Sequence, residues 1–286
     1  MKIPLATQRM RLPFSGALLQ CLRADDTPIP NAFASGFIRR EAGKLWLYTC
    51  WHVVTGFNPY DIKVGLQLPE RRGLRVALQA SEERQPGVEV IGGLQEVVIP
   101  LYEEGDGASR PRWFQDSRHV PHPDLNAVGL FVPFWHDLVK IELPATLRLS
   151  DWQLINETSL IGSDGGLITP GDKCMVVGYP FGFSAHGSGQ PAPVALTRFA
   201  ASDRISDRRQ QLLLESAGAP GMSGGPVFVE RGDDLRFFGA YVGTIYPDHT
   251  VGSNEKVSAL GVVANISMLL WGGLAMVNVP SEPHTT

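Results

Sequence analysis

Short apolar segments recur along the chain, and turn-forming residues separate them. They are rich in aromatic and β-branched residues, which favour β-strands. The first two segments flank Glu41-Ala42-Gly43 and predict a hairpin. The predicted strands cover residues 33–39, 44–50, 62–66, 74–78, 88–91, 98–102, 127–132, 174–178, 194–200, 212–215, 226–230, 236–245 and 258–263.

Their spacing is fairly regular, and few segments have a helical period. This pattern predicts an all-β sandwich or a pair of barrels and argues against a doubly wound sheet. Residues 145–172 are polar and glycine-rich, so they predict a connector between two lobes, 1–150 and 151–286. Residues 69–93 carry charge runs around short apolar pieces, which predicts a charged hairpin inserted in the first lobe.

The uncharged segment 257–280 is long enough to raise the question of a transmembrane helix. Polar residues such as Asn265 and Ser267 interrupt it, and no basic cluster follows. We therefore expect a buried strand over 258–263 and a packed C-terminal helix over 264–270, with a membrane anchor as the alternative.

Composition narrows the class of protein further. The chain has 286 residues, a net charge of −4 and 43% hydrophobic residues, which predicts a globular core and no nucleic-acid partner. Its 31 glycines and 22 prolines favour a fold with many turns. The odd, widely separated cysteines Cys21, Cys50 and Cys174 predict reduced thiols. With no signal-peptide pattern at the start, we expect a cytoplasmic protein.

The most specific chemical motif is Gly218-Ala219-Pro220-Gly221-Met222-Ser223-Gly224-Gly225-Pro226-Val227. A serine hydroxyl needs a base and a site that stabilises the oxyanion formed by its attack. Flanking glycines let the chain turn so that the amides of Gly221 and Ser223 point into one space. An incidental serine in a glycine-rich turn is the alternative.

The same residues also fit Gly-x-Ser-x-Gly, the elbow of α/β-hydrolases, which requires a helix after the serine. Here Pro226 and a β-rich run follow. The late pair Asp248-His249 keeps this reading open, with a small-molecule esterase as its functional consequence.

His52 and Asp124 are the candidate base and acid. His52 ends a strongly apolar strand, and Asp124 opens one, where a carboxylate can be buried against an imidazole. The rivals for the acid are Asp116, Asp137 and Asp151, and none of them opens a comparable strand. His119 and His122 lie near Asp124 without a further well-placed ligand, so we expect no metal and no cofactor.

These residues together resemble the trypsin-like serine peptidases of the chymotrypsin superfamily, in their bacterial intracellular type. The order His52, Asp124, Ser223 matches the His, Asp, Ser order of that family. Three further segments are similar to family motifs: residues 34–38 before the histidine, 177–182 at the start of the second lobe, and 238–243 after the nucleophile.

The resemblance implies two perpendicular six-stranded β-barrels with a catalytic triad between them. It also implies a serine endopeptidase that cleaves protein substrates through an acyl-enzyme, with an oxyanion hole formed by the Gly221 and Ser223 amides. Val242, Gly243 and Thr244 would pair with the substrate backbone. A catalytically silent binding module on the same fold is the alternative function.

Two departures from the family pattern change the expected regulation and specificity. Met222 stands where secreted members have an aspartate that pairs with a newly cut N-terminus. Control by a regulatory protein partner or a conformational trigger is therefore expected. Ala217 lies six residues before the nucleophile and offers no charge, which predicts a small or apolar substrate side chain in the pocket.

Overall fold

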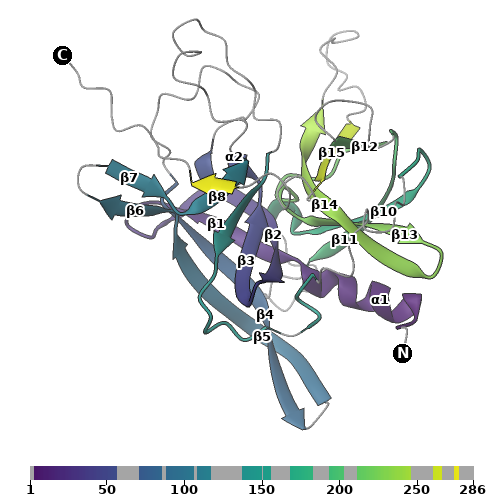
Figure 1. Cartoon of the computed structure of the whole chain (residues 1–286), viewed down its shortest axis with the longest axis horizontal. Coiled ribbons are helices and arrows are strands. Elements are labelled where there is room, and N and C mark those ends of the chain that lie inside the picture. Colours follow the sequence, from purple (N-terminus) through teal and green to yellow (C-terminus); the bar gives the residue numbers. More distant parts are fainter. Residues whose placement is uncertain are drawn as a thin grey trace, which may run out of the picture.

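The computed structural model describes the chain in eleven ranges and shows an all-β protein with few helices (Figure 1). The described residues are 3–56, 71–85, 88–105, 108–116, 137–149, 151–155, 168–182, 193–202, 211–245, 260–265 and 274–276. The predicted strands 62–66 and 127–132 lie outside these ranges.

The first lobe is built on an eight-stranded sheet in the order β16-β8-β9-β3-β2-β1-β4-β5. Its long strand β2 bends so that it pairs with β1 on one side and β3 on the other. The strands are β1 (Ala17–Leu22), β2 (Pro28–Glu41), β3 (Lys44–Thr49), β4 (Gly73–Gln85), β5 (Val88–Pro100), β8 (Trp113–Asp116), β9 (Val139–Glu142) and β16 (Leu274–Met276). A separate hairpin joins β6 (Tyr102–Gly105) and β7 (Ala108–Pro111).

The expected hairpin around Glu41 is present. Glu41 pairs with Lys44 across a two-residue turn in which Ala42 and Gly43 both have positive φ, at 48° and 80°. Such turns match the twist of the flanking strands. The Arg112 amide donates to the Leu101 carbonyl over 2.9 Å and extends the β6–β7 hairpin by one further hydrogen bond.

The second lobe is a six-stranded barrel that closes on itself. Its order is β11-β10-β13-β14-β15-β12. A bridge between Ala200 and Leu214 and a hydrogen bond of 2.7 Å from the Ala201 amide to the Leu213 carbonyl join the two edges. The strands are β10 (Lys173–Gly178), β11 (Val194–Phe199), β12 (Gln211–Leu214), β13 (Pro226–Arg231), β14 (Asp234–Ile245) and β15 (Leu260–Asn265). The prediction of an all-β fold with two barrel lobes is confirmed, although the first sheet has eight strands where six were expected.

Helices are short in the described residues, and none of them is long and apolar enough to cross a membrane. They are α1 (Leu5–Arg11), α2 (Trp51–Thr55) and the 3₁₀ turns η1 (Leu12–Ser15) and η5 (Pro180–Gly182). Helix α1 lies against the second lobe, where the Arg9 guanidinium contacts the Glu230 carboxylate at 2.7 Å (Figure 1).

The start of the predicted C-terminal helix is wrong. Ala264 and Asn265 belong to β15, where they pair with Ala240 and Gly239 of β14. The β-branched run before them continues as a strand because β14 and β12 offer hydrogen-bonding edges on both sides. Residues 266–270 lie outside the described part, and the next described element, β16, is a strand that pairs with β8 of the first lobe.

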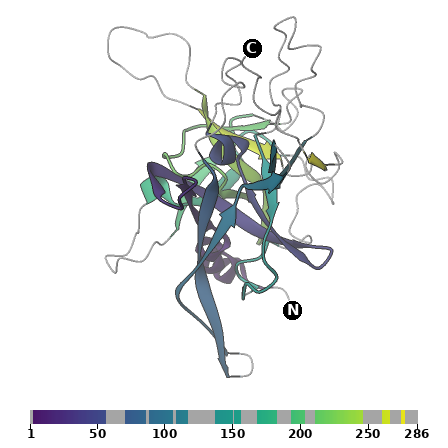
Figure 2. The ribbon, with the colours of Figure 1, turned by 90° about the vertical axis from the view of Figure 1, so that its left-hand side faces the viewer.

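The β4–β5 hairpin extends far from the rest of the molecule (Figures 1 and 2). It includes most of the segment 69–93 that the charge runs marked as a hairpin, and its pairing continues to Pro100 opposite Gly73. Residues 69 and 70 lie outside the described part. The boundary proposed at residue 150 remains a prediction.

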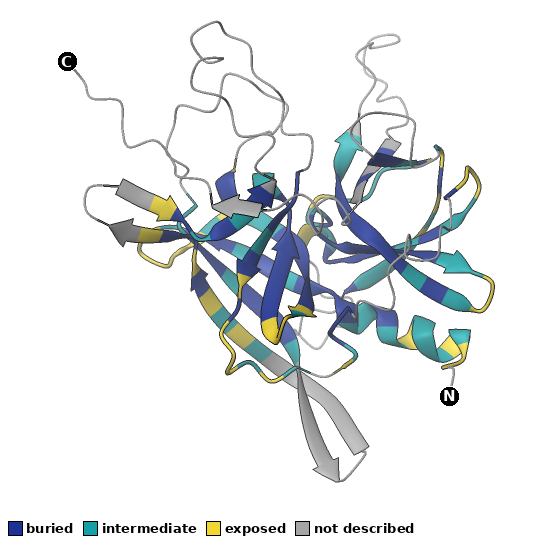
Figure 3. Ribbon diagram, in the orientation of Figure 1, coloured by how far each residue is buried: buried dark blue, intermediate teal, exposed yellow. Residues whose placement is uncertain are grey.

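Aromatic side chains form a common core where the two lobes meet. Phe37 of β2 stacks on Tyr48 at 5.2 Å between ring centroids and contacts Phe237 of β14 edge-on at 5.0 Å. Phe237 also packs against Phe228, at 5.7 Å. Strands near this junction are buried along much of their length (Figure 3). The packing holds β3, which precedes His52, against the lobe that carries Ser223.

We predict that Phe237→Ala lowers the free energy of unfolding by about 3–5 kcal/mol, because it removes a fully buried ring that both lobes contact. Urea unfolding monitored by tryptophan fluorescence measures the change. Phe199→Ala is the matched control, since Phe199 is 45% exposed, and it should change stability by about 0.5 kcal/mol or less. Equal effects of the two substitutions would contradict the shared core.

Candidate active site

His52 lies in the single helical turn α2, immediately after β3. Cys50 is the extended N-cap residue, and Gly56 ends the turn with a left-handed φ of 79°, its amide donating to the His52 carbonyl at 2.8 Å. The Arg71 guanidinium donates to the carbonyls of His52 and Val53 at 2.9 and 2.6 Å. These contacts satisfy the free carbonyls at the end of the turn and fix the backbone of His52.

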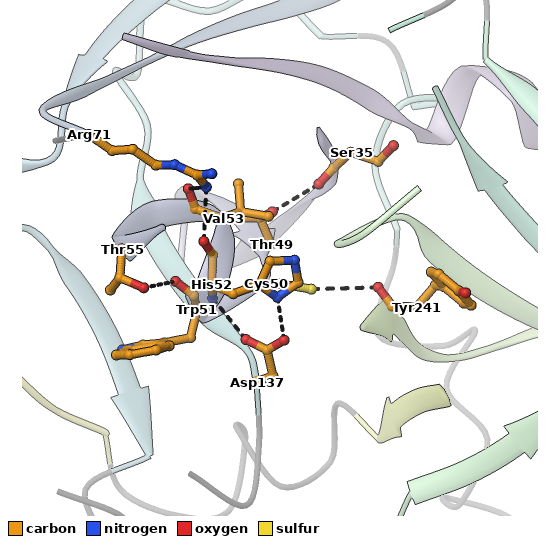
Figure 4. A network of polar contacts seen from close by, with 10 residues as sticks. All are labelled: Ser35, Thr49, Cys50, Trp51, His52, Val53, Thr55, Arg71, Asp137 and Tyr241. Carbon is orange, nitrogen blue, oxygen red and sulfur yellow. Dashed lines mark hydrogen bonds and ion pairs between the residues drawn. The ribbon is translucent and has the colours of Figure 1, made fainter. Parts of the chain in front are cut away.

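Asp137 clamps His52 through two hydrogen bonds (Figure 4). Its Oδ1 accepts from the His52 amide at 2.9 Å, and its Oδ2 lies 2.5 Å from the His52 Nδ1. The carboxylate is only 2% exposed, whereas the imidazole is 28% exposed. A carboxylate at Nδ1 holds the proton on that nitrogen, which leaves Nε2 unprotonated and able to accept a proton from a neighbouring group.

The carboxylate beside His52 belongs to Asp137, one of the three alternative candidates for the acid. Asp124 lies outside the described residues. The expectation that none of the alternative acids opens a comparable strand is wrong. Asp137 directly precedes buried Leu138 and strand β9, in which Val139 and Ile141 are buried. Strand β9 has only four residues and follows an aromatic, polar segment, so its periodicity is weak in the sequence. Its pairing with β3 brings Asp137 to His52.

The Ser223 loop is anchored to the segment that carries His52. The Ser35 amide donates to the Ser223 carbonyl at 2.9 Å, and the Gly224 amide donates to the Tyr241 carbonyl at 2.7 Å. The same carbonyl accepts the Cys50 thiol at 3.5 Å (Figure 4). The Tyr241 carbonyl thus contacts both Cys50, which lies two residues before His52, and Gly224, which follows Ser223.

Ser223 itself is partly exposed and lies in the turn that precedes β13. Strand β13 begins at Pro226, so the helix that an α/β-hydrolase elbow requires is not present there. Among the hydrogen bonds of the described residues, none joins the Ser223 hydroxyl to the His52 ring. Catalytic hydrogen bonds of this kind are often long without substrate and shorten in the complex.

The amides of Gly221 and Ser223 remain available as donors. No carbonyl of the described residues accepts from either of them. The Pro220 carbonyl is held by the Phe181 amide at 2.6 Å, and the Gly221 carbonyl by the Ser35 hydroxyl at 2.7 Å. The N–H groups of Gly221 and Ser223 thus have no acceptor among the described residues, so they could donate to an oxyanion if both face it.

Ser35 is a site residue whose role the sequence reasoning missed. Its side chain is fully buried, and its hydroxyl donates to the Gly221 carbonyl while accepting the Tyr179 amide at 2.9 Å. Its carbonyl accepts the Thr49 hydroxyl at 2.8 Å. In the sequence, segment 34–38 is similar to a family motif, and these hydrogen bonds explain why a serine stands in it.

Cys50, His52 and Asp137 offer ligand atoms within 4.8 Å of one another. Burial, followed by the charge of Asp137, raises the pKa of the Cys50 thiol well above its usual value. The thiol is therefore protonated at neutral pH. Both oxygens of Asp137 already accept hydrogen bonds from His52. This donor set suits proton transfer at the imidazole better than the binding of a metal, which needs a thiolate.

The predicted substrate edge lies at the end of β14. On one edge of β14, pairing with β13 ends where Pro226 lies opposite Ala240, and beyond it Tyr241 forms backbone hydrogen bonds with Gly224 and Gly225. On the other edge, pairing with β15 continues as far as Ile245. A bulge lies between Tyr241 and Gly243. Within the described residues, no strand covers the second edge of Val242–Gly243–Thr244. An extended peptide can add there as a further strand.

Comparison with solved structures finds proteases. A serine endoprotease from Yersinia pestis has a TM-score of 0.47 and 13% identity, over 94% of this chain and 65% of that chain. An HtrA-type protease, AlgW with tripeptide, has a TM-score of 0.45 and 17% identity, over 94% and 62%. The chain spans less than two thirds of the length of each. No protein-family model and no curated protein matches the sequence.

We predict that Gly224→Ala strongly destabilises the protein, because a Cβ there would lie 2.2 Å from the Ser35 carbonyl oxygen and 2.4 Å from the Thr49 hydroxyl. The loss should be about 3 kcal/mol or more in chemical denaturation. Gly232→Ala is the matched control: its φ is also positive, at 54°, but nothing lies within 4 Å of its Cβ position. It should cost only about 1–2 kcal/mol, and a similar loss in both variants would disprove the close packing of the loop.

Proposed function

We propose that this protein is a serine endopeptidase in which Ser223 is the nucleophile, His52 the general base and Asp137 the residue that orients the imidazole. The double hydrogen bond from His52 to Asp137, beside the anchored loop of Ser223, is the observation that carries the proposal. Burial of the carboxylate below a partly exposed ring gives the imidazole the tautomer that proton abstraction requires.

The reaction follows from these positions. As the Ser223 Oγ bonds to the substrate carbonyl carbon, its proton passes to the His52 Nε2 and the carbonyl π electrons move to oxygen. The amides of Gly221 and Ser223 donate to that oxyanion. The C–N bond then breaks, the amine leaves with the proton from His52, and an acyl-enzyme remains. Water repeats the sequence with His52 as base, which releases the acid and restores Ser223.

Asp137 stabilises the imidazolium that forms twice in each cycle. Its two hydrogen bonds fix both the ring and the backbone of His52, so the imidazole is held in place before the substrate arrives. Preorganisation of this kind reduces the rearrangement needed in the transition state.

Control by a partner protein or a conformational trigger, and a cytoplasmic location, remain proposals. Met222 supports the first of them. It is fully buried and belongs to the hydrophobic core cluster of the second lobe, so the residue beside the nucleophile packs in an apolar setting. An N-terminal amine has no carboxylate to pair with at that position.

We predict that a fluorophosphonate probe labels wild-type protein at Ser223, with Ser223 Oγ attacking phosphorus and fluoride leaving. Intact-mass and peptide mass spectrometry detect the adduct. Ser223→Ala is the control and should remain unlabelled. His52→Ala should reduce labelling by a factor of about 10³ or more, because the members of a triad act as a unit. Folded wild-type protein that stays unlabelled would favour the catalytically silent binding module.

We predict further that Asp137→Asn lowers kcat for a cleaved peptide by about 10⁴, because the amide would stabilise the wrong imidazole tautomer. Stopped time-point assays on one fluorogenic peptide measure it. Asp124→Asn is the comparison, and it should retain activity near wild type if Asp137 is the acid. The opposite ranking of the two variants would return the acid role to Asp124.

A further inference from the structure

The ring of Tyr241 occupies the space between the segment before the nucleophile and the end of β14. Tyr241 is only 2% exposed. Two glycines face its ring: a Cβ on Gly218 would lie 2.8 Å from Cζ, and one on Gly261 would lie 3.1 Å from Cε2. These glycines line a slot that the tyrosine fills.

Hydrogen bonds hold the ring in the slot at its far end. The Gly218 amide donates to the Tyr241 hydroxyl at 2.7 Å, and that hydroxyl lies 2.9 Å from the hydroxyl of Thr244. Gly218 belongs to the segment that precedes Ser223, and Thr244 to the free strand edge. The tyrosine therefore ties together the two segments that a substrate side chain would have to separate.

A substrate in this site has little choice of where to place the side chain that precedes the cleaved bond. Its carbonyl carbon must meet the Ser223 hydroxyl, its carbonyl oxygen the two loop amides, and its backbone the edge at 242–244. With the Ala217–Gly218 segment shortly before Ser223 in the chain and Thr244 on the free edge, the side chain would enter between these two segments. That is where the Tyr241 ring lies.

We propose that Tyr241 closes this pocket, so that the protein cleaves after residues with very small side chains: glycine, alanine or serine. The inference rests on the proposed peptidase function and narrows it. Ala217 by itself is compatible with either a small or a larger apolar substrate side chain in the pocket. The filled slot removes the larger ones.

Displacing the ring would be unfavourable. It would expose a buried tyrosine to water and leave the Gly218 amide without its acceptor. A leucine or phenylalanine before the cleaved bond has to overcome both losses, whereas an alanine methyl group needs no movement of the ring. Discrimination by a closed pocket of this kind reaches about 10–200-fold for a single methylene.

The test uses the full-length protein and a set of internally quenched peptides that differ only in the residue before the cleaved bond. Wild type should have a kcat/KM at least about 100-fold higher for alanine than for phenylalanine. Tyr241→Ala should raise the phenylalanine-to-alanine ratio of kcat/KM at least tenfold. Tyr241→Phe keeps the ring and should preserve the wild-type ratio, whatever its absolute rate.

Wild type alone can overturn the proposal: equal cleavage after alanine and phenylalanine would mean that the ring does not close the pocket. This arm does not depend on the folding of a variant. Should Tyr241→Ala fail to fold by circular dichroism, Tyr241→Val is assayed in its place, and an unchanged ratio in a folded variant also overturns the proposal.

Fluorophosphonate labelling of the same preparations separates the two hypotheses. Labelled Ser223 without discrimination by side-chain size contradicts the closed pocket and leaves the peptidase. Unlabelled Ser223 contradicts the peptidase, and the pocket is then tested on Ser223→Ala with product peptides that end in alanine or phenylalanine. Calorimetry should detect binding of the alanine peptide alone; binding of both, or of neither, counts against the closed pocket.

Discussion

The site depends on one buried residue, Ser35, through which the two lobes are joined. Its amide, carbonyl and hydroxyl all form hydrogen bonds, and their partners include the carbonyls of Ser223 and Gly221. The Thr49 hydroxyl, three residues before His52, donates to its carbonyl. Because the side chain is fully buried, each of these bonds would be costly to lose. The relative position of Ser223 and His52 is therefore set by hydrogen bonds between the segments that carry them.

Close backbone approach explains the glycines of the nucleophile loop. Gly224 has a φ of 86° and lies against the Ser35 carbonyl and Thr49, so a side chain would push apart the segments that carry Ser223 and His52. Glycine costs conformational entropy in this position, and the hydrogen bonds to Ser35 and Tyr241 offset it. The glycine motif is thus needed for the joining of the lobes, in addition to the oxyanion role proposed for its amides.

Local patterns could be predicted from the sequence, and contacts between distant segments could not. The glycines around Ser223 and the apolar strand before His52 are visible in short windows, and so is the all-β class. The choice of two barrels over a sandwich came from the family resemblance. Asp137 reaches His52 only through the pairing of β9 with β3, which no local pattern encodes. Residue 264 was assigned to a helix for a similar reason, since the edges of β14 and β12 decide that it continues a strand.

Tyr241 links the Ser223 loop to the proposed substrate pocket. Its carbonyl accepts from Gly224 and from Cys50, while its ring fills the slot between Gly218 and Gly261. The first function belongs to the main chain and is independent of the side chain. A substitution of the ring can therefore change which substrates fit without moving the serine loop, provided that the strand keeps its place. In the proposed peptidase, specificity and catalytic geometry would meet in one residue and could vary separately, because different atoms of that residue would carry them.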